Sequence, residues 1–184
     1  VIASPKGGKP PVDPKSLQPE NQSESTKRLQ NDLVVKQKLE NTLILNEISD
    51  GEYDTLFLPG GHGPMWDLSQ DNDLKRIVES FYNNKKIISA VCHGPAGLLR
   101  ATDNNGNSIL KDKRVTGFTN DEEHTVKLDK TVPFLLEDKM KELGGNFKKT
   151  ENFKPFIVSD GQIITGQNPA SSLLAAKRVV EVLK

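Results

Sequence analysis

Apolar and polar residues alternate along this chain in blocks that predict an alternation of strands and helices. Residues 55–58 and 85–91 are short apolar runs, and a turn that contains glycine follows each of them. Between these runs, residues 71–84 predict a helix whose apolar positions share one face: Leu74, Ile77, Val78 and Phe81. Because helices flank the run at 85–91, this run is expected to form a parallel strand that is buried on both faces.

The second half of the chain continues this alternation. In chain order it predicts a helix at 94–101, a turn at 104–107 and a strand at 114–118. A helix at 132–145, a hairpin at 156–166 and a helix at 168–183 follow. Gly144 and Gly145 are typical of a helix C-terminus, and Asn168 with Pro169 is typical of a helix start. Near the N-terminus, residues 22–46 predict short helices. The pattern favours one α/β domain over residues 1–184, with a parallel sheet.

Composition excludes several classes of protein. The chain has 184 residues, with 25 Lys and Arg against 25 Asp and Glu, so no excess of charge favours nucleic acid or an anionic membrane surface as a partner. No run of 18 apolar residues predicts a membrane-spanning helix. The single cysteine cannot form an internal disulfide, which favours the cytoplasm. Three histidines scattered along the sequence predict no metal site.

That single cysteine lies in the segment SAVCHGPAG, between a predicted strand and a predicted helix. Ala90 and Gly94 stand two positions on either side of Cys92, which is the small-residue spacing of a nucleophile elbow. A lone cysteine is more often a buried structural residue, but the elbow spacing and the neighbouring His93 favour a nucleophile. A helix N-terminus at this point predicts a lowered pKa for the thiol.

Two further segments offer groups that a thiol enzyme needs. PGGHG follows the strand at 55–58, and the backbone N–H of Gly61, together with that of His93, is expected to stabilise an oxyanion. A histidine that acts as a base needs an acidic partner to orient it. After the strand at 114–118, this partner could be Asp121, Glu122 or Glu123, and spacing alone does not choose among them.

Five motifs in order, DTLFLPGGHGPMWDL, AVCHGPAGLL, VTGFTNDEE, VPFLLED and ITGQNPAS, resemble the DJ/PfpI superfamily, and within it the heat-shock-protein-31-like, glyoxalase III-like branch. The resemblance implies a flavodoxin-like α/β/α sandwich related to class I glutamine amidotransferases. It implies Cys92, His93 and Glu123 as catalytic residues. It also implies an oxyanion or substrate-binding role for Gly61, His62 and Gly94.

The activity implied by the resemblance is that of a glyoxalase without cofactor or metal, which converts methylglyoxal, a small reactive aldehyde, to lactate and protects against stress. Alternatives are a cysteine-dependent deglycase, a peptidase, or a holdase chaperone that does not need Cys92. A glutamine amidotransferase is disfavoured, because its His-x-Glu motif near the C-terminus is absent. The resemblance also implies a homodimer.

The start of the chain departs from the family pattern. VIAS reads as the end of a buried strand, and the family has an earlier strand and a glutamate that faces the thiol. Neither has a counterpart in this sequence. We therefore expect residues 1–184 to be an N-terminally incomplete form of the domain.

Overall fold

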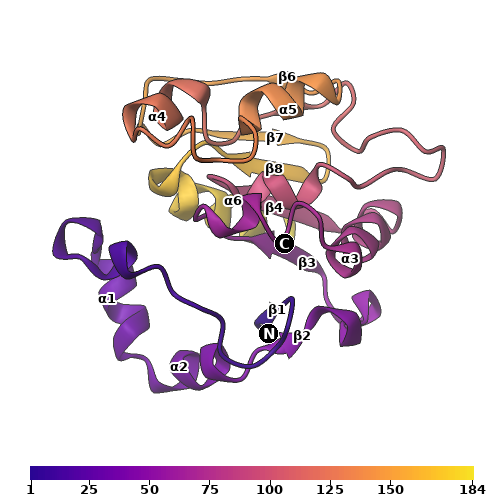
Figure 1. The fold of residues 1–184 in the computed structure, drawn as a ribbon. Coiled ribbons are helices and arrows are strands. Elements are labelled where there is room, and N and C mark those ends of the chain that lie inside the picture. Colours follow the sequence, from indigo (N-terminus) through magenta and orange to yellow (C-terminus); the bar gives the residue numbers. More distant parts are fainter. The chain divides into compact units, whose positions relative to one another are not determined.

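The computed structural model describes the backbone of residues 1–184 and the side chains of residues 1–49 and 51–184. The chain divides into two compact units, Val1–Ile48 and Ser49–Lys184. In the first unit, β1 (Ala3–Ser4) pairs in parallel with β2 (Leu43–Ile44). The helices are α1 (Glu24–Asn31) and α2 (Leu33–Glu40) (Figure 1). Three short 3-10 helices accompany them, at Pro14–Leu17, Pro19–Asn21 and Leu45–Glu47.

Polar side chains at the helix starts explain α1 and α2. The Ser23 hydroxyl accepts a hydrogen bond from the Thr26 N–H, and the Asp32 carboxylate accepts from the N–H groups of Val34 and Val35. The short helices expected over residues 22–46 are therefore confirmed up to Glu40. At Leu43–Ile44 the expectation was wrong, since these residues pair as a strand, and a 3-10 helix then begins at Leu45.

The second unit is built on a four-stranded sheet in the order β3 (Thr55–Leu58), β4 (Ile87–Val91), β8 (Ile163–Gly166) and β7 (Ile157–Asp160). β3, β4 and β8 are parallel, and β7 runs antiparallel to β8 as the predicted hairpin. A separate parallel pair joins β5 (Arg114–Val115) to β6 (Asn146–Phe147). The flavodoxin-like α/β class with a mostly parallel sheet is confirmed.

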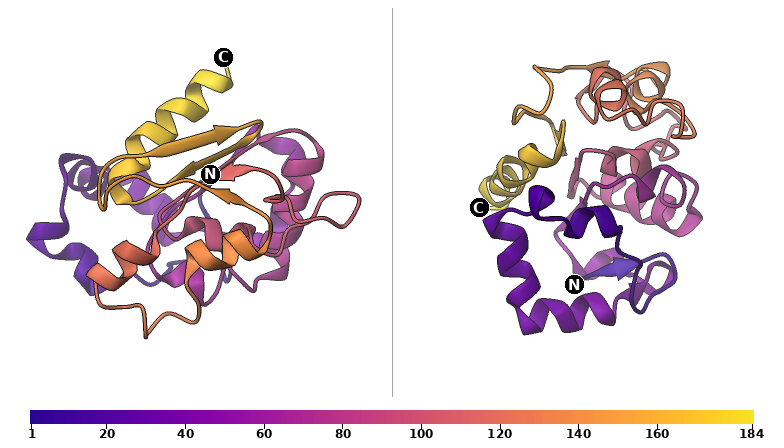
Figure 2. Two further views of the ribbon diagram at one scale, coloured as in Figure 1. Left: turned by 90° about the horizontal axis from the view of Figure 1, so that it is seen from above. Right: turned by 60° about the vertical axis from the view of Figure 1, so that its left-hand side comes forward.

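Helices cover this sheet (Figures 1 and 2). α3 (Asn72–Asn83) packs against β3 and β4, and α6 (Ser172–Val182) packs against β4 and β8. One buried cluster joins α6 to the sheet: Ala175 and Val179 of α6 pack with Val91 and Ile164 of the strands. Buried apolar side chains of β4 therefore meet helices, as its mainly apolar sequence predicted.

Several elements are shorter than the sequence indicated. Residues 94–101 contain a 3-10 helix, Gly94–Leu98, and residues 114–118 contain only the two-residue β5. α5 (Leu136–Glu142) starts after a bend that includes Pro133, a residue that cannot donate within a helix. α4 (Asn120–Thr125) and 3-10 helices at Asp50–Glu52, Gly63–Met65 and Pro169–Ser171 complete the unit. Among the described residues, no helix has the length and apolar character needed to cross a bilayer.

The carboxyl ends of the three parallel strands meet at one edge of the sheet. Leu58 of β3 is level with Ala90 of β4, and Val91 is level with Gly166 of β8. The segments that leave these ends therefore start side by side. Open α/β sheets place their ligands at this edge.

Candidate active site

Cys92 stands at a strained turn directly after β4. Its φ is +59°, a left-handed conformation that non-glycine residues seldom adopt. Two hydrogen bonds fix this turn, from the Cys92 N–H to the Gly166 carbonyl and from the Phe118 N–H to the Cys92 carbonyl, both at 2.9 Å. This strained backbone is the conformation expected of a nucleophile elbow.

Glycines on both sides make room for the turn. A Cβ atom added at Gly94 would lie 2.4 Å from the carbonyl oxygen of Leu58, which is backbone and cannot move aside easily. A Cβ at Gly60 would lie 2.5 Å from the Cβ of Cys92. The close contact with β3 thus explains why a small residue is needed at Gly94. Gly60 allows a second close contact, with the side chain of Cys92, which the sequence pattern did not indicate.

The thiol of Cys92 is buried, with only 5% of the residue exposed. Burial raises the pKa of this thiol to about 12, although the backbone N–H groups of Gly61 and His93 both donate hydrogen bonds to it and lower the pKa. The expectation of a lowered pKa was therefore wrong. The element that follows is a five-residue 3-10 helix, and its dipole does not offset the loss of water around the sulfur.

His93 links the thiol to an acidic residue. Its Nδ1 lies 3.3 Å from the Cys92 Sγ, and its Nε2 lies 2.6 Å from the Glu123 Oε2. Burial lowers the pKa of His93, more than the hydrogen bond with Glu123 raises it. In the neutral ring the proton belongs on Nε2, where it is donated to the carboxylate, so Nδ1 is free to accept a proton from the thiol.

Of the three acidic candidates, Glu123 contacts His93. Asp121 instead pairs on the surface with Lys149, at 2.8 Å. Burial by itself would raise the pKa of Glu123, but hydrogen bonds from His62 and His93 outweigh it and lower the pKa to about 2. Glu123 is consequently ionised at neutral pH and holds the imidazole of His93 in one orientation.

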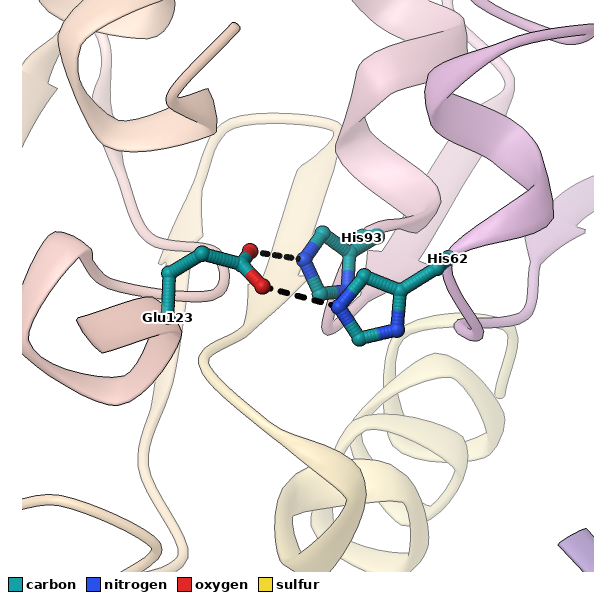
Figure 3. A group of neighbouring side chains, drawn as sticks. All are labelled: His62, His93 and Glu123. Carbon is teal, nitrogen blue, oxygen red and sulfur yellow. Dashed lines mark hydrogen bonds and ion pairs between the residues drawn. The ribbon is translucent and has the colours of Figure 1, made fainter. Parts of the chain in front are cut away.

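His62 is the second histidine on the same carboxylate. Its Nε2 lies 2.8 Å from the Glu123 Oε1, so one carboxylate joins two rings that leave adjacent strands (Figure 3). The two imidazole centroids are 4.1 Å apart, and Phe118 lies 4.4 Å from the ring of His93. The His62 side chain is 30% exposed and gives this otherwise buried group its opening to solvent.

Glu122 has a structural role that sequence reasoning missed. Its buried carboxylate accepts hydrogen bonds from the N–H groups of Thr119 and Phe153 and from the side-chain amides of Gln167 and Asn168. These bonds join α4 to the segments on either side of the β7–β8 hairpin, and so fix the helix that carries Glu123. The sequence held one signal for this, since Thr119 and Glu122 have the spacing of a capping box.

The chain resembles known proteins of one family in both sequence and structure. The model of the DJ-1/PfpI family matches residues 20–182. A probable glutathione-independent glyoxalase of Schizosaccharomyces pombe, hsp3103, is 34% identical over 153 residues, which cover 79% of this chain and 59% of that protein. The glutathione-independent glyoxalase HSP31 of Saccharomyces cerevisiae is 31% identical over 144 residues, which cover 75% of this chain and 61% of that protein.

Solved structures agree with these matches. The Rapid Encystment Protein 24 kDa of Francisella tularensis aligns with a TM-score of 0.90 and 38% identity, over 97% of this chain and 78% of that one. The glyoxalase III of Candida albicans aligns with a TM-score of 0.83 and 28% identity, over 93% of this chain and 75% of that one. This chain spans about three fifths of the length of the yeast relatives just described.

Proposed function

Since this chain belongs to the DJ-1/PfpI family, we propose that it is a glutathione-independent glyoxalase, which converts methylglyoxal and water to lactate through a covalent adduct on Cys92. The proposal rests on the groups that surround the sulfur atom of Cys92. The N–H groups of Gly61 and His93 are directed at the Cys92 Sγ, and the His93 Nδ1 lies 3.3 Å from it. A nucleophile, a base and two oxyanion donors are thereby within reach of one carbonyl group.

In the first step the Cys92 sulfur attacks the aldehyde carbon. The thiol proton passes to the Nδ1 of His93, and the aldehyde oxygen becomes an alkoxide that accepts hydrogen bonds from the N–H groups of Gly61 and His93. Glu123 stabilises the imidazolium formed by this transfer through its 2.6 Å hydrogen bond. The alkoxide then takes this proton from the Nδ1 of His93, which gives a hemithioacetal and returns the imidazole to its neutral form. Because the resting thiol is protonated, its deprotonation accompanies the attack.

In the second step the substrate isomerises without any external oxidant or reductant. A base removes the proton from the former aldehyde carbon, which produces an enediol, and the neighbouring carbon then receives a proton. The first carbon is oxidised to a thioester while the second is reduced to an alcohol. Water hydrolyses the thioester, which releases lactate and restores the thiol. His93 is the base nearest to the sulfur and serves both proton transfers.

The other predicted residues have supporting roles in this proposal. His62 positions Glu123 through their 2.8 Å contact and faces the substrate where the site opens to solvent. Gly94 allows the elbow to approach β3. The cytoplasm as compartment and a homodimer as assembly stay predictions.

Proton NMR of the reaction in D₂O tests this proposal. The chain is incubated with methylglyoxal and no glutathione, and the products are followed over time. We expect lactate that carries deuterium on its second carbon, because a proton held by His93 exchanges with the solvent before it is returned. Lactate with protium at that carbon would refute the role of His93, and an absence of lactate above the rate without protein would refute the activity.

A further inference from the structure

The fold assembles a group of metal-binding atoms that are far apart in the sequence. His62 follows β3, His93 follows β4, and Glu123 lies on α4, yet one ligand atom from each lies within 4.8 Å of the other two. Figure 3 shows both imidazoles turned toward the same carboxylate. The expectation of no metal site rested on sequence spacing, which does not reveal that the ends of adjacent parallel strands meet.

The donor atoms match one class of ion. Two imidazole nitrogens and one carboxylate oxygen suit borderline divalent ions, and Zn²⁺ is often held by three protein ligands with a fourth position left open. His93 and Glu123 are buried, and Phe118 packs against His93. The partly exposed His62 side chain provides the route by which an ion could enter. These three side chains form a small, partly buried set of nitrogen and oxygen donors.

We propose that His62, His93 and Glu123 bind a divalent transition-metal ion such as Zn²⁺, through the Nε2 atoms of both histidines and one carboxylate oxygen. The ion would replace the two hydrogen bonds that now join the rings to Glu123. A neutral imidazole that gives its Nε2 to a metal carries its proton on Nδ1. Binding therefore requires a change of tautomer at each histidine. Small movements must also separate the two rings from the carboxylate, so that each ligand atom lies about 2.0–2.2 Å from the ion.

The Cys92 thiol is not a ligand in this arrangement. Its sulfur lies 3.3 Å from the His93 Nδ1, on the opposite flank of the ring from the Nε2 that the metal would take. This placement distinguishes the proposed site from metal capture by a reactive cysteine, in which sulfur is the principal ligand.

Metal binding and thiol activation would exclude each other. With the metal on Nε2, the Nδ1 of His93 holds a proton that faces the Cys92 sulfur, so His93 cannot accept the thiol proton. This consequence rests on the proposed function, and we expect Zn²⁺ to inhibit the enzyme reversibly. The binding itself does not depend on any activity.

Cobalt absorption and zinc calorimetry on the tag-free chain test the site. We expect one Co²⁺ per chain, with visible bands of a low-coordinate nitrogen and oxygen site and no near-ultraviolet charge-transfer band from sulfur, and we expect Zn²⁺ to displace it. His62→Ala and Glu123→Gln should each weaken Zn²⁺ binding by roughly 100-fold or more, since they remove a direct ligand. His62→Gln provides a milder variant of the partly exposed position.

Two matched variants complete the experiment. Cys92→Ser should keep the binding, and so should His124→Ala, because His124 is a half-exposed histidine that pairs with Asp129 away from the cluster. Circular dichroism verifies that each variant is folded. The proposal is overturned if wild type binds no Co²⁺, if both His62 variants bind as tightly as wild type, or if Cys92→Ser abolishes binding.

Discussion

The charge on Glu123 is predicted to contribute strongly to stability, and Glu123→Gln tests this. The pKa of Glu123 falls from an ordinary 4.5 to about 2 through its bonds to His62 and His93. Since one pKa unit corresponds to about 1.4 kcal/mol, folding favours the ionised carboxylate by about 3 kcal/mol. Glutamine keeps the shape but has no charge, and its NH₂ group faces one of the two rings. We expect Glu123→Gln to lower the free energy of unfolding by about 3 kcal/mol at pH 7.

The effect has a defined dependence on pH. A lowered pKa in the folded state stabilises the protein fully above pH 4.5, and this stabilisation is lost as the pH falls toward 2. At pH 3, between these two pKa values, less than half of it remains. Urea unfolding followed by circular dichroism at pH 7 and pH 3 measures both values. Asp121→Asn is the control, because Asp121 is exposed and its ion pair with Lys149 lies on the surface.

Two outcomes would contradict this reasoning. A difference below about 0.5 kcal/mol at pH 7, the size expected of an ordinary surface substitution, would mean that the two histidines do not stabilise the charge. A difference that stays the same from pH 7 to pH 3 would mean that the variant is destabilised by shape rather than by the loss of ionisation.

Further predictions concern the thiol, the elbow and the neighbouring carboxylate. Because burial raises the pKa of Cys92 to about 12, its rate of alkylation by iodoacetamide should rise steadily from pH 7 to pH 10, and a plateau below pH 9 would contradict this. Gly94→Ala should lower the free energy of unfolding by about 3 kcal/mol, since its Cβ would lie 2.4 Å from a backbone oxygen. Gly63→Ala, whose Cβ would have no atom within 4 Å, should lower it by less than about 0.5 kcal/mol, and thermal unfolding measures both variants. Glu122→Ala leaves four donors without their acceptor and should lower the unfolding free energy by roughly 3 kcal/mol or more in urea, and a loss under about 1 kcal/mol would refute its role in holding α4.

The sequence predicted the sheet and the elbow because both depend on local pattern. An apolar run between helices indicated the buried β4, and small residues around Cys92 indicated the turn that its positive φ confirms. The N–H groups of Gly61 and His93 were also expected as oxyanion donors, and both donate hydrogen bonds to the sulfur of Cys92. The contact of Glu123 with His93 was anticipated only from the family resemblance.

Features that depend on burial and on distant contacts were not predictable. The pKa of Cys92 is set by loss of water around the sulfur, which the sequence does not display. The 2.8 Å contact of His62 with Glu123 joins residues 61 positions apart. Glu122 and Glu123 are neighbours in the sequence, but they point to different sides of α4, so one joins backbone segments while the other faces the histidines.

Lactate release from methylglyoxal by wild type and by Cys92→Ser, measured without glutathione, tests the central claim most directly. The serine hydroxyl keeps the size of the side chain but is a much poorer nucleophile than sulfur. We predict that wild type forms lactate and that Cys92→Ser is slower by roughly 1000-fold or more in kcat/KM. Lactate formation by Cys92→Ser within about tenfold of the wild-type rate would contradict a mechanism that proceeds through this thiol.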